Sequence, residues 1–309
     1  MHFISEETSA HLVTRALAFD AARAALVAAA SQAVSTFPVV LGHGTAAENR
    51  FSIKSASDGT LAGVKIGSYW PGNSARGLPR HNSVILFFDQ ERGRIDTVIE
   101  AGLVNAYRTA AADAVAVDHL ARPDAGTLAV FGTGNQAFHE VAALAEVRQI
   151  RRVLVVGRSP EATAAFCARL ARAGLPAGQP AAAREACAAA EIIVTATPSR
   201  APLFDADWVR PGTHVSAMGA DGPGKQELPP ALLARARLYC DDPEQSRRIG
   251  EMQHAPAEAP LRAIGAALDD PGARGWAADT VTVFDSSGLS IQDLYIARAL
   301  MAAERSAAA

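Results

Sequence analysis

Residues 126–141, GTLAVFGTGNQAFHEV, decide the fold of the region around them. An apolar run ends at Gly132, and a stretch of helix-forming residues begins after Gly134. Gly132, Gly134 and Ala137 have the spacing GxGxxA. In a strand–turn–helix unit the first glycine permits the tight turn, the second lets the backbone approach a pyrophosphate, and the small third residue packs helix on strand. The stretch, which includes Asn135 and Gln136, predicts a dinucleotide-binding turn; the alternative is a tight turn without a ligand.

The pattern around this turn predicts an α/β protein. After Pro123, apolar strands alternate with helices, which is typical of a parallel sheet with helices on both faces. Before it, residues 5–35 predict a helix, short β-prone runs over 37–100 predict an antiparallel sheet, and 103–121 predict another helix. A late strand at 280–288 and a final helix at 291–304 end the pattern.

The end of the second predicted strand of the parallel region bears on cofactor choice. An NAD site usually has an acid there that binds the ribose hydroxyls. This chain has Gly157, which leaves room, Arg158, a cation suited to a 2′-phosphate, and Ser159, a further donor. We therefore predict NADP(H) in preference to NAD(H). Arg158 stacking on adenine, or simply solvated, is the alternative.

Composition excludes several other classes. The 309 residues carry 29 basic and 32 acidic side chains with no basic block, which gives no support to a nucleic-acid or membrane partner. The three cysteines are isolated and the eight histidines scattered, so we expect neither disulfides nor a metal site. The early acids of the N-terminal residues do not form a signal pattern, and we expect a cytoplasmic protein that acts on a small molecule.

Six separated stretches carry a family resemblance: VKIGSYWPGNSARGL (64–78), AYRTAAA (106–112), FGTGNQA (131–137), GADGPGKQEL (219–228), RIGEMQ (248–253) and VFDSSGLSIQDL (283–294). Together they resemble the ornithine cyclodeaminase/mu-crystallin family. The resemblance implies a homodimer. It also implies a substrate-binding and dimerisation domain of α+β type over 1–120, rejoined by a C-terminal helix at about 288–309, and a Rossmann-type, doubly wound NAD(P)-binding domain over 121–287.

The resemblance also implies the reacting groups. Asp221 would move a proton or water at the substrate's reacting carbon, and Lys225 would help to hold that region. Lys65 and Arg108 would bind the substrate α-carboxylate, with Lys65 counted as catalytic and Ser83 near the substrate. Without the resemblance, surface salt bridges for Lys65 and Arg108 and a cap on a helix beginning near Gln226 for Asp221 are the alternatives. The cofactor side would gain five further residues: Thr109, Thr197, Met218, Gly219 and Ser287.

Two departures from the cyclodeaminase pattern shape the predicted activity. Val40 stands where that enzyme has a second carboxylate-binding arginine. Ser52 stands where it has the glutamate that binds the distal amine, and Lys54 and Ser55 replace a Met-Pro step. We therefore predict an NAD(P)-dependent reductase that converts an α-imino acid (ketimine) into an α-amino acid. Ornithine cyclodeaminase, which forms proline and ammonia, and an NADPH-dependent binding protein without turnover are the alternatives.

Overall fold

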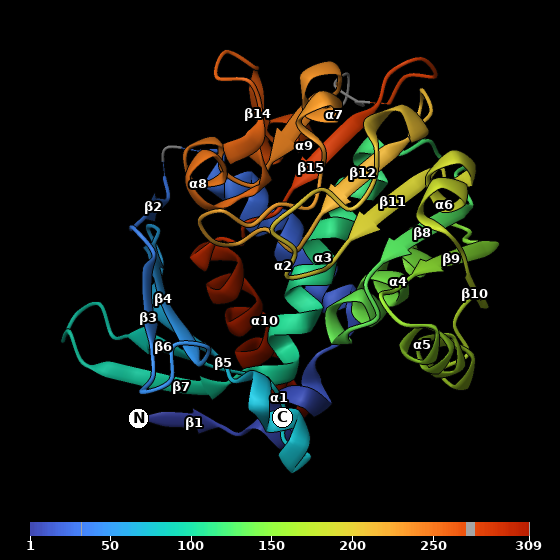
Figure 1. Cartoon of the computed structure of the whole chain (residues 1–309). Helices are drawn as coiled ribbons and strands as arrows, with labels where there is room; N and C mark the ends of the chain where they lie inside the picture. The colour runs from blue at the N-terminus through green and yellow to red at the C-terminus, as the bar shows by residue number, and fades with distance from the viewer. Residues whose placement is uncertain (32, 270–275, 309) are drawn as a thin grey trace. The chain divides into compact units, whose positions relative to one another are not determined.

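The computed structural model describes residues 1–31, 33–269 and 276–308 (Figure 1). Its internal contacts divide the chain into two compact units. Unit 1 comprises Met1–Arg108 with Leu289–Ala309, and unit 2 comprises Thr109–Gly288. The division falls within helix α3 (Gly102–Leu120), the same helix at whose end the sequence predicts a domain boundary.

Unit 1 is built on a seven-stranded sheet among the described residues. In spatial order its strands are β1 (His2–Ile4), β7 (Ile95–Glu100), β6 (His81–Phe88), β5 (Ala62–Tyr69), β4 (Arg50–Ser57) and β2 (Ser35–Thr36), and β3 (Val40–His43) also pairs with β4. The neighbours are antiparallel, as predicted, apart from β1, which runs parallel to β7. Strand β1 was not predicted, because three residues are too few to show a period.

The prediction of a single helix over 5–35 is wrong. The structure has two helices there, α1 (Glu6–Leu12) and α2 (Arg15–Ala29). The first helix ends where Val13 becomes extended, and Thr14 starts the second, because its hydroxyl accepts a hydrogen bond from the Leu17 amide at 3.1 Å. The predicted Ser5 cap is confirmed by a bond from the Thr8 amide. Helix η1 (Pro71–Arg76) follows β5.

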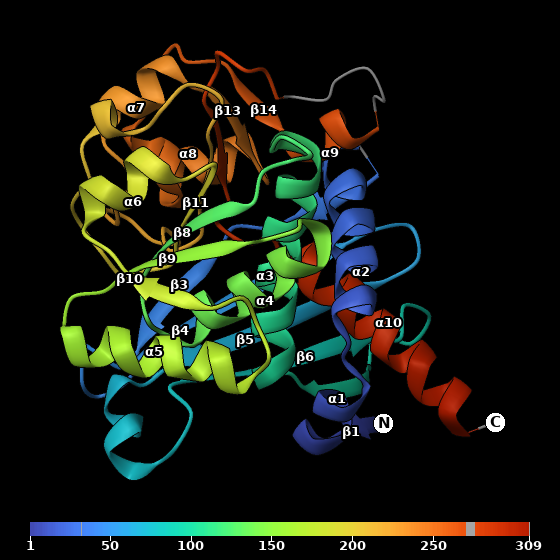
Figure 2. The ribbon, with the colours of Figure 1, turned by 90° about the vertical axis from the view of Figure 1, so that its right-hand side faces the viewer.

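The C-terminal helix α10 (Ser290–Ala308) packs against α2 and against β4, β5 and β6, so the last residues complete the core of unit 1 (Figures 1 and 2). Gly63 of β5 allows this close packing, because a Cβ there would lie 2.6 Å from Leu294 Cδ2. Burial along β4–β7 alternates with period two, which defines an inner face that carries Ile85 and Ile99 together with the polar Lys54, Lys65 and Ser83.

Unit 2 contains an eight-stranded parallel sheet among the described residues. Its order is β10 (Gly178–Pro180), β9 (Arg152–Val156), β8 (Thr127–Phe131), β11 (Ile192–Thr195), β12 (His214–Ala217), β15 (Thr282–Asp285), β13 (Arg237–Cys240) and β14 (Leu261–Ala263). Figure 2 shows β8, β9 and β11 side by side. The chain leaves β8 in one direction for β9 and β10, then returns to the other side of β8 for β11 and β12. Because such crossovers are right-handed, the reversal puts helices on opposite faces, which makes the fold Rossmann-type and doubly wound.

The helices of unit 2 connect these strands. They are α4 (Asn135–Val147), α5 (Pro160–Arg172), α6 (Ala183–Ala189), η2 (Ala206–Trp208), α7 (Pro230–Arg235), α8 (Pro243–Ile249), η3 (Glu251–His254) and α9 (Ile264–Leu268). Each predicted strand and helix of this region is confirmed. The short edge strands β10 and β14 were not predicted. Strand residues such as Leu128, Ile193, Val215 and Val283 are fully buried, which explains their continuous apolar runs.

Candidate active site

The glycine-rich turn has the geometry that a pyrophosphate requires. Gly132 has a φ of +120°, and a Cβ there would lie 2.8 Å from the Ala196 carbonyl oxygen. Gly134 caps α4, and apart from its chain neighbours no described atom lies within 4 Å of where its Cβ would be. Helix α4 is thirteen residues long, and the unpaired amides and the dipole at the start of such a helix favour an anion. Ala137 is fully buried, as its packing role demands.

The other predicted cofactor residues of unit 2 gather at the same edge of the sheet. Phe131, Val156, Thr195, Ala217 and Asp285 lie level with one another at the carboxyl ends of five adjacent parallel strands. The residues that follow them include Arg158 and Ser159 after β9, Thr197 after β11, Met218 and Gly219 after β12, and Ser287 after β15. Ligands of doubly wound sheets bind at this edge, next to the point where strand order reverses.

Several of these side chains already have partners within unit 2. The Ser159 hydroxyl caps α5 by accepting from the Ala162 amide. The Ser287 hydroxyl donates to Asp241 and accepts from Gln245. Gly157 has a packing reason besides room for a phosphate, because a Cβ would collide with the side chains of Thr163 and Thr133.

A buried glutamate that was not among the predicted site residues fixes two loops at this edge. Glu227 accepts hydrogen bonds from the amide and hydroxyl of Thr197, both at 2.7 Å, from the Thr195 hydroxyl at 2.8 Å and from the Gly219 amide at 2.8 Å. Gly219 must be glycine, since a Cβ would lie 2.7 Å from the Glu227 carboxyl group and would also strike the Thr197 carbonyl. Burial raises the pKa of Glu227, and this effect exceeds the lowering that the hydrogen bonds cause.

Asp221 and Lys225 form an ion pair within the glycine-rich loop after β12. Lys225 also donates to the Gly219 carbonyl at 3.2 Å, so the lysine ties the acid to the end of the strand. The Asp221 side chain keeps 58% of its surface exposed. The alternative of a helix cap is wrong: the next helix begins at Pro230, with Pro229 as its cap, and no described helix begins near Gln226.

Residues of η3 hold this loop in shape. Glu251 accepts from the amides of Glu227 and Leu228, and burial raises its pKa to about 8. Gln253 accepts from the Gly224 amide at 2.8 Å and donates to the carbonyls of Gly222 and Lys225. The stretch around Gln253 belongs to the sequence resemblance, and these bonds now give it a structural reason.

In unit 1, the predicted carboxylate-binding residues meet at a buried acid. Lys65 Nζ lies 3.0 Å and Arg108 Nε 2.8 Å from Oδ1 of Asp293 on α10, and both cations also donate to Asn105 Oδ1. Lys65 and Arg108 are only 6% and 7% exposed, so the alternative of surface salt bridges is wrong. Asp293 and Asn105 were not predicted, although Asp293 lies within a stretch that carries the resemblance.

Burial and like charge set the protonation of this cluster. Burial, reinforced by Arg108 and Lys54 and opposed by Asp293, lowers the pKa of Lys65 to about 7. Burial alone would raise the pKa of Asp293, but the cations Arg108, Lys65 and Lys54 hold it below its usual value. Near pH 7, Lys65 is therefore present in both its charged and its neutral form, and an anion beside it favours the charged form.

The remaining predicted residues have simple positions. Ser83 lies buried on the inner face of unit 1, and its hydroxyl donates to the Ala101 carbonyl at 2.7 Å. Thr109 lies half-buried on α3 in unit 2. Val40 of β3 is exposed, and Ser52 of β4 faces Gly67 of β5 across the ladder.

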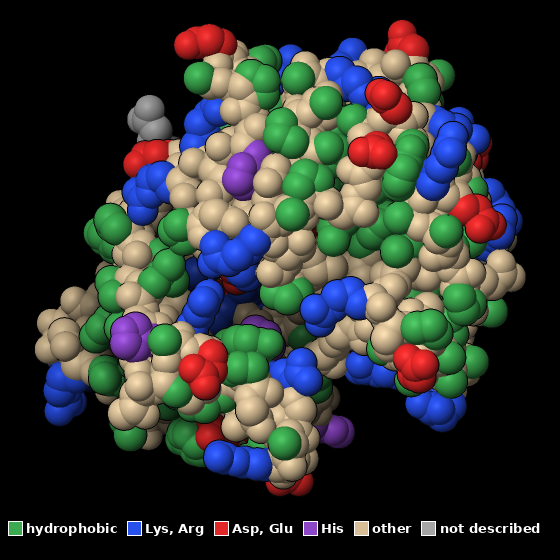
Figure 3. Space-filling model, in the orientation of Figure 1, with side chains coloured by type: hydrophobic (Ala, Val, Ile, Leu, Met, Phe, Trp, Pro, Cys, Tyr) green, Lys and Arg blue, Asp and Glu red, His purple; other side chains and the backbone are tan. Residues whose placement is uncertain are grey.

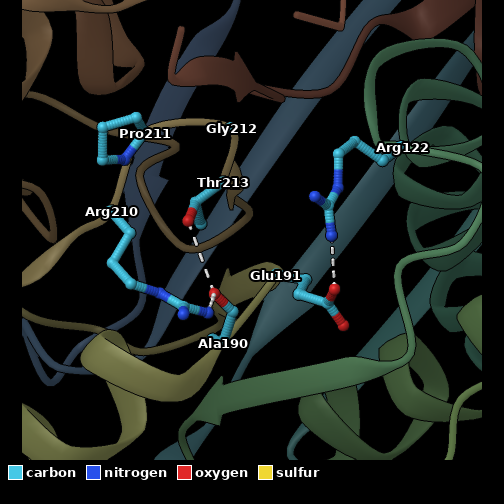
Figure 4. Close-up of a pocket in the computed structure, with 7 residues that line it drawn as sticks. All are labelled: Arg122, Ala190, Glu191, Arg210, Pro211, Gly212 and Thr213. Carbon is cyan, nitrogen blue, oxygen red and sulfur yellow. Dashed lines mark hydrogen bonds and ion pairs between the residues drawn. The ribbon is translucent and has the colours of Figure 1, made fainter. Parts of the chain in front are cut away.

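A separate pocket of about 330 Å³ lies at the opposite edge of the parallel sheet (Figure 4). Glu191 and Thr213, which line it, immediately precede β11 and β12. Its charged side chains interact with other groups of the protein: Arg122 pairs with Glu191 at 2.5 Å, and Arg210 donates to the carbonyls of Ala189 and Ala190. This pocket is therefore distinct from the edge that carries the glycine-rich turn.

Other kinds of site find no support in the described chain. Within it, no three His, Cys, Asp or Glu side chains are grouped to hold a metal ion. None of the helices described is both long enough and apolar enough to cross a membrane. On the face drawn in Figure 3, basic and acidic side chains are interspersed among hydrophobic ones.

Comparison with known proteins agrees with this geometry. A profile described as the ornithine cyclodeaminase/mu-crystallin family matches residues 3–307. The chain belongs to this family. It is 37% identical to the iminosuccinate reductase of Paracoccus denitrificans (strain Pd 1222), over 97% of the chain and 96% of the relative. The solved structure of the Paracoccus denitrificans iminosuccinate reductase in complex with NAD+ matches with a TM-score of 0.90 and 35% identity, covering 100% of this chain and 97% of that one.

Two further relatives of this chain have names other than iminosuccinate reductase. The delta(1)-pyrroline-2-carboxylate reductase of Paracoccus denitrificans (strain Pd 1222) is 35% identical over 78% of each chain. An archaeal alanine dehydrogenase dimer with bound NAD matches in structure with a TM-score of 0.90 and 28% identity, covering 100% of this chain and 97% of that one.

Proposed function

We propose that the protein is an NAD(P)-dependent oxidoreductase that reduces an α-imino acid to an α-amino acid. The buried pair of cations, Lys65 and Arg108, carries the proposal, because such a pair suits a carboxylate withdrawn from water. The names of two relatives, iminosuccinate reductase and delta(1)-pyrroline-2-carboxylate reductase, both denote reduction of a C=N bond.

The residues of unit 2 fit a nicotinamide dinucleotide. Gly132, Gly134 and the first amides of α4, with Asn135, would hold the pyrophosphate, and Thr197, Met218, Gly219 and Ser287 line the same edge of the sheet. When bound in its reduced form, the cofactor supplies a hydride to the imine carbon. We assign this role to unit 2 and substrate binding to unit 1, with Thr109 on the cofactor side.

The residues of the chain bind, orient and move a proton. Lys65 and Arg108 bind the α-carboxylate and thereby hold the C=N bond in one orientation. As hydride adds to carbon, the two π electrons of the C=N bond become a lone pair on nitrogen, and nitrogen takes up one proton to give the amine. Asp221, an exposed carboxylate tied to Lys225, is the group that we assign to this proton.

A spectrophotometric assay tests the proposal. NADPH or NADH is mixed with the protein, ammonium and a panel of 2-oxo acids, or with preformed cyclic imino acids, and the loss of reduced-cofactor absorbance is followed. Oxidation that requires both the imine and the enzyme supports the proposal. If no compound of the panel causes oxidation of the reduced cofactor, the proposal is overturned. Formation of proline and ammonia from ornithine and NAD+ would then identify a cyclodeaminase. Tight NADPH binding with no turnover would identify a binding protein.

We further propose that NADP(H) is preferred. Arg158 is exposed at the end of β9, next to the cap of α5, where a cation suits a 2′-phosphate. Titration of Arg158→Ala with both cofactors tests this. We expect at least about tenfold weaker binding of NADPH, the scale of one charge-assisted hydrogen bond, and little change for NADH. Equal losses for the two cofactors, or a wild-type preference for NADH, would refute the phosphate-binding role.

We also propose a cytoplasmic homodimer that associates through unit 1. The outer face of its sheet exposes Val40 of β3 and Ile66 of β5, which both lie opposite Ile53 of β4, and exposed apolar side chains grouped in this way favour association. The related archaeal structure is named as a dimer. Light scattering of the protein and of Ile66→Lys tests the assignment, with a monomeric wild type as the refuting result. Cys167, Cys187 and Cys240 are free thiols, which fits a reducing compartment.

A further inference from the structure

Arg169 of α5 is a cation to which the proposed function gives no role. Its guanidinium lies beside the first turn of α4: Nη2 donates to Asn135 Oδ1 at 2.9 Å, and Cζ lies 3.8 Å from the centre of the Phe138 ring. Asn135 is the first residue of α4 and directly follows Gly134, so this contact is made next to the glycine-rich turn. Because a cation is attracted to an aromatic face, the two contacts together hold a long side chain in one place.

The charge of Arg169 is not balanced by an acid. In the part of the chain that the structure describes, no carboxylate pairs with this half-buried side chain. Burial lowers the pKa of its guanidinium, whereas a neighbouring carboxylate would raise it. Arg122 and Arg148 of the same unit, by contrast, each form an ion pair with an acidic side chain. A partly buried cation without a counter-charge favours the binding of an anion nearby.

The contact with Arg169 also determines how the Asn135 amide is oriented. A guanidinium carries only N–H donors, so the amide oxygen must face it and the amide nitrogen is left for other partners. Asn135 is exposed, and among the described residues its Nδ2 donates to no other group. It lies at the start of a helix, where unpaired backbone amides and the dipole favour an anion. Asn135 and Arg169 therefore add donors and a positive charge to the turn formed by Gly132 and Gly134.

We propose that Arg169 belongs to the dinucleotide site, where it attracts the diphosphate and keeps the Asn135 amide nitrogen available to it. This inference rests on the proposed function, because it requires the protein to bind a nicotinamide dinucleotide. The diphosphate is common to NADH, NADPH and ADP-ribose, so Arg169 acts on all three alike. It differs in this from Arg158, which we assign to the 2′-phosphate of NADPH alone.

Calorimetric titration of Arg169→Met with these three compounds tests the role. Methionine keeps an apolar contact with Phe138 but removes the charge and the hydrogen bond to Asn135. We expect the dissociation constant of each compound to rise about tenfold, the scale of one charge-assisted hydrogen bond. Arg169→Lys, which keeps the charge, should lose less affinity. A loss confined to NADPH, or no loss for any of the three, overturns the assignment.

The salt dependence of binding separates an electrostatic role from a merely structural one. Salt screens the attraction between partly exposed charges, but it does not repair a packing defect. The difference in NADH affinity between the wild type and Arg169→Met should therefore shrink at least about twofold between about 0.05 M and about 0.5 M NaCl. A difference that stays constant over this range would show that Arg169 only ties α5 to α4, and would refute the attraction of the diphosphate.

Arg172→Gln is the matched control, because it removes an exposed cation three residues further along α5. It should leave all three dissociation constants unchanged, and an equal loss in this variant would refute a specific role for Arg169. If the wild type binds neither NADH nor NADPH, the proposed function itself is overturned. If the wild type binds them and Arg169→Met binds them equally well, only the role of Arg169 is overturned.

Discussion

Replacing Asp293 with asparagine removes the carboxylate that the buried cations Lys65 and Arg108 of unit 1 share. Lys65 Nζ and Arg108 Nε lie 3.0 and 2.8 Å from its Oδ1. At an effective dielectric constant of about 20, a pair of charges 3 Å apart attracts by about 5 kcal/mol, equivalent to about 4 pKa units. The asparagine variant should therefore contain a neutral Lys65 at any pH above about 5.

The loss of stability should depend on pH in a defined direction. In the wild type the pKa of Lys65 is about 7 when folded, below its unfolded value, so the folded protein gains its pairing with Asp293 only below pH 7. At pH 9 Lys65 is neutral in both proteins, and the variant loses about 3 kcal/mol from the uncompensated Arg108. At pH 5 the wild type has gained about 2.7 kcal/mol that the variant lacks, so the loss approaches about 6 kcal/mol.

Denaturant unfolding at pH 5 and pH 9 measures these values, and hydrogen exchange of the β4 and β5 amides assigns the change to unit 1. Asp118→Asn is the control: its partner Arg148 is 2.7 Å away at a half-exposed site, so we expect a loss of about 1 kcal/mol or less at both pH values. An Asp293→Asn loss that is the same at pH 5 and pH 9 would show that Lys65 does not titrate near 7, and would refute the charge argument.

Three further predictions concern catalysis. Asp221→Asn should lower kcat by about 10²–10⁴-fold and leave the cofactor dissociation constant nearly unchanged, because it removes the proton-transferring group; an unchanged kcat would exclude this role. Glu227→Gln, which leaves the Thr197 and Gly219 amides with a poorer acceptor, should speed hydrogen exchange in the loop of residues 219–226 and lower kcat at least about tenfold, and normal exchange would contradict it. Pyruvate binding measured by calorimetry should weaken about tenfold per pH unit above 7 as Lys65 loses its proton, but stay flat in Lys65→Arg; a flat wild-type profile would count against the low pKa.

The sequence predicted the parallel region well because its signals are local. The turn at Gly132 and Gly134 needs particular residue types at particular spacings, and the alternation of apolar strands with helices can be read directly from the sequence. The antiparallel sheet was predicted for the same reason. The short strands β1, β10 and β14 carry no period of their own and exist only through pairing with longer neighbours.

The reacting groups of the candidate site were predicted only through the family resemblance. Lys65, Arg108 and Asp221 were assigned in this way, but the residues that they contact were not predicted. Asp293 lies 228 residues from Lys65, and no local pattern marks a carboxylate that acts at such a separation. Lys54 was visible as a departure from the cyclodeaminase pattern, yet its burial opposite Lys65 emerged only from the strand register.

The position of Asp293 on α10 has a consequence for biosynthesis. Domains emerge from the ribosome and fold from the N-terminus onwards. The parallel sheet of unit 2 is complete once β15 has been made, whereas the strands that carry Lys54 and Lys65 must wait for a helix translated more than 200 residues later. During that interval, three mutually repelling cations have neither their counter-charge nor the helix that covers them. Released chains that end just before α10 should therefore expose the inner face of unit 1 to chaperones, although they contain every strand of the unit 2 sheet.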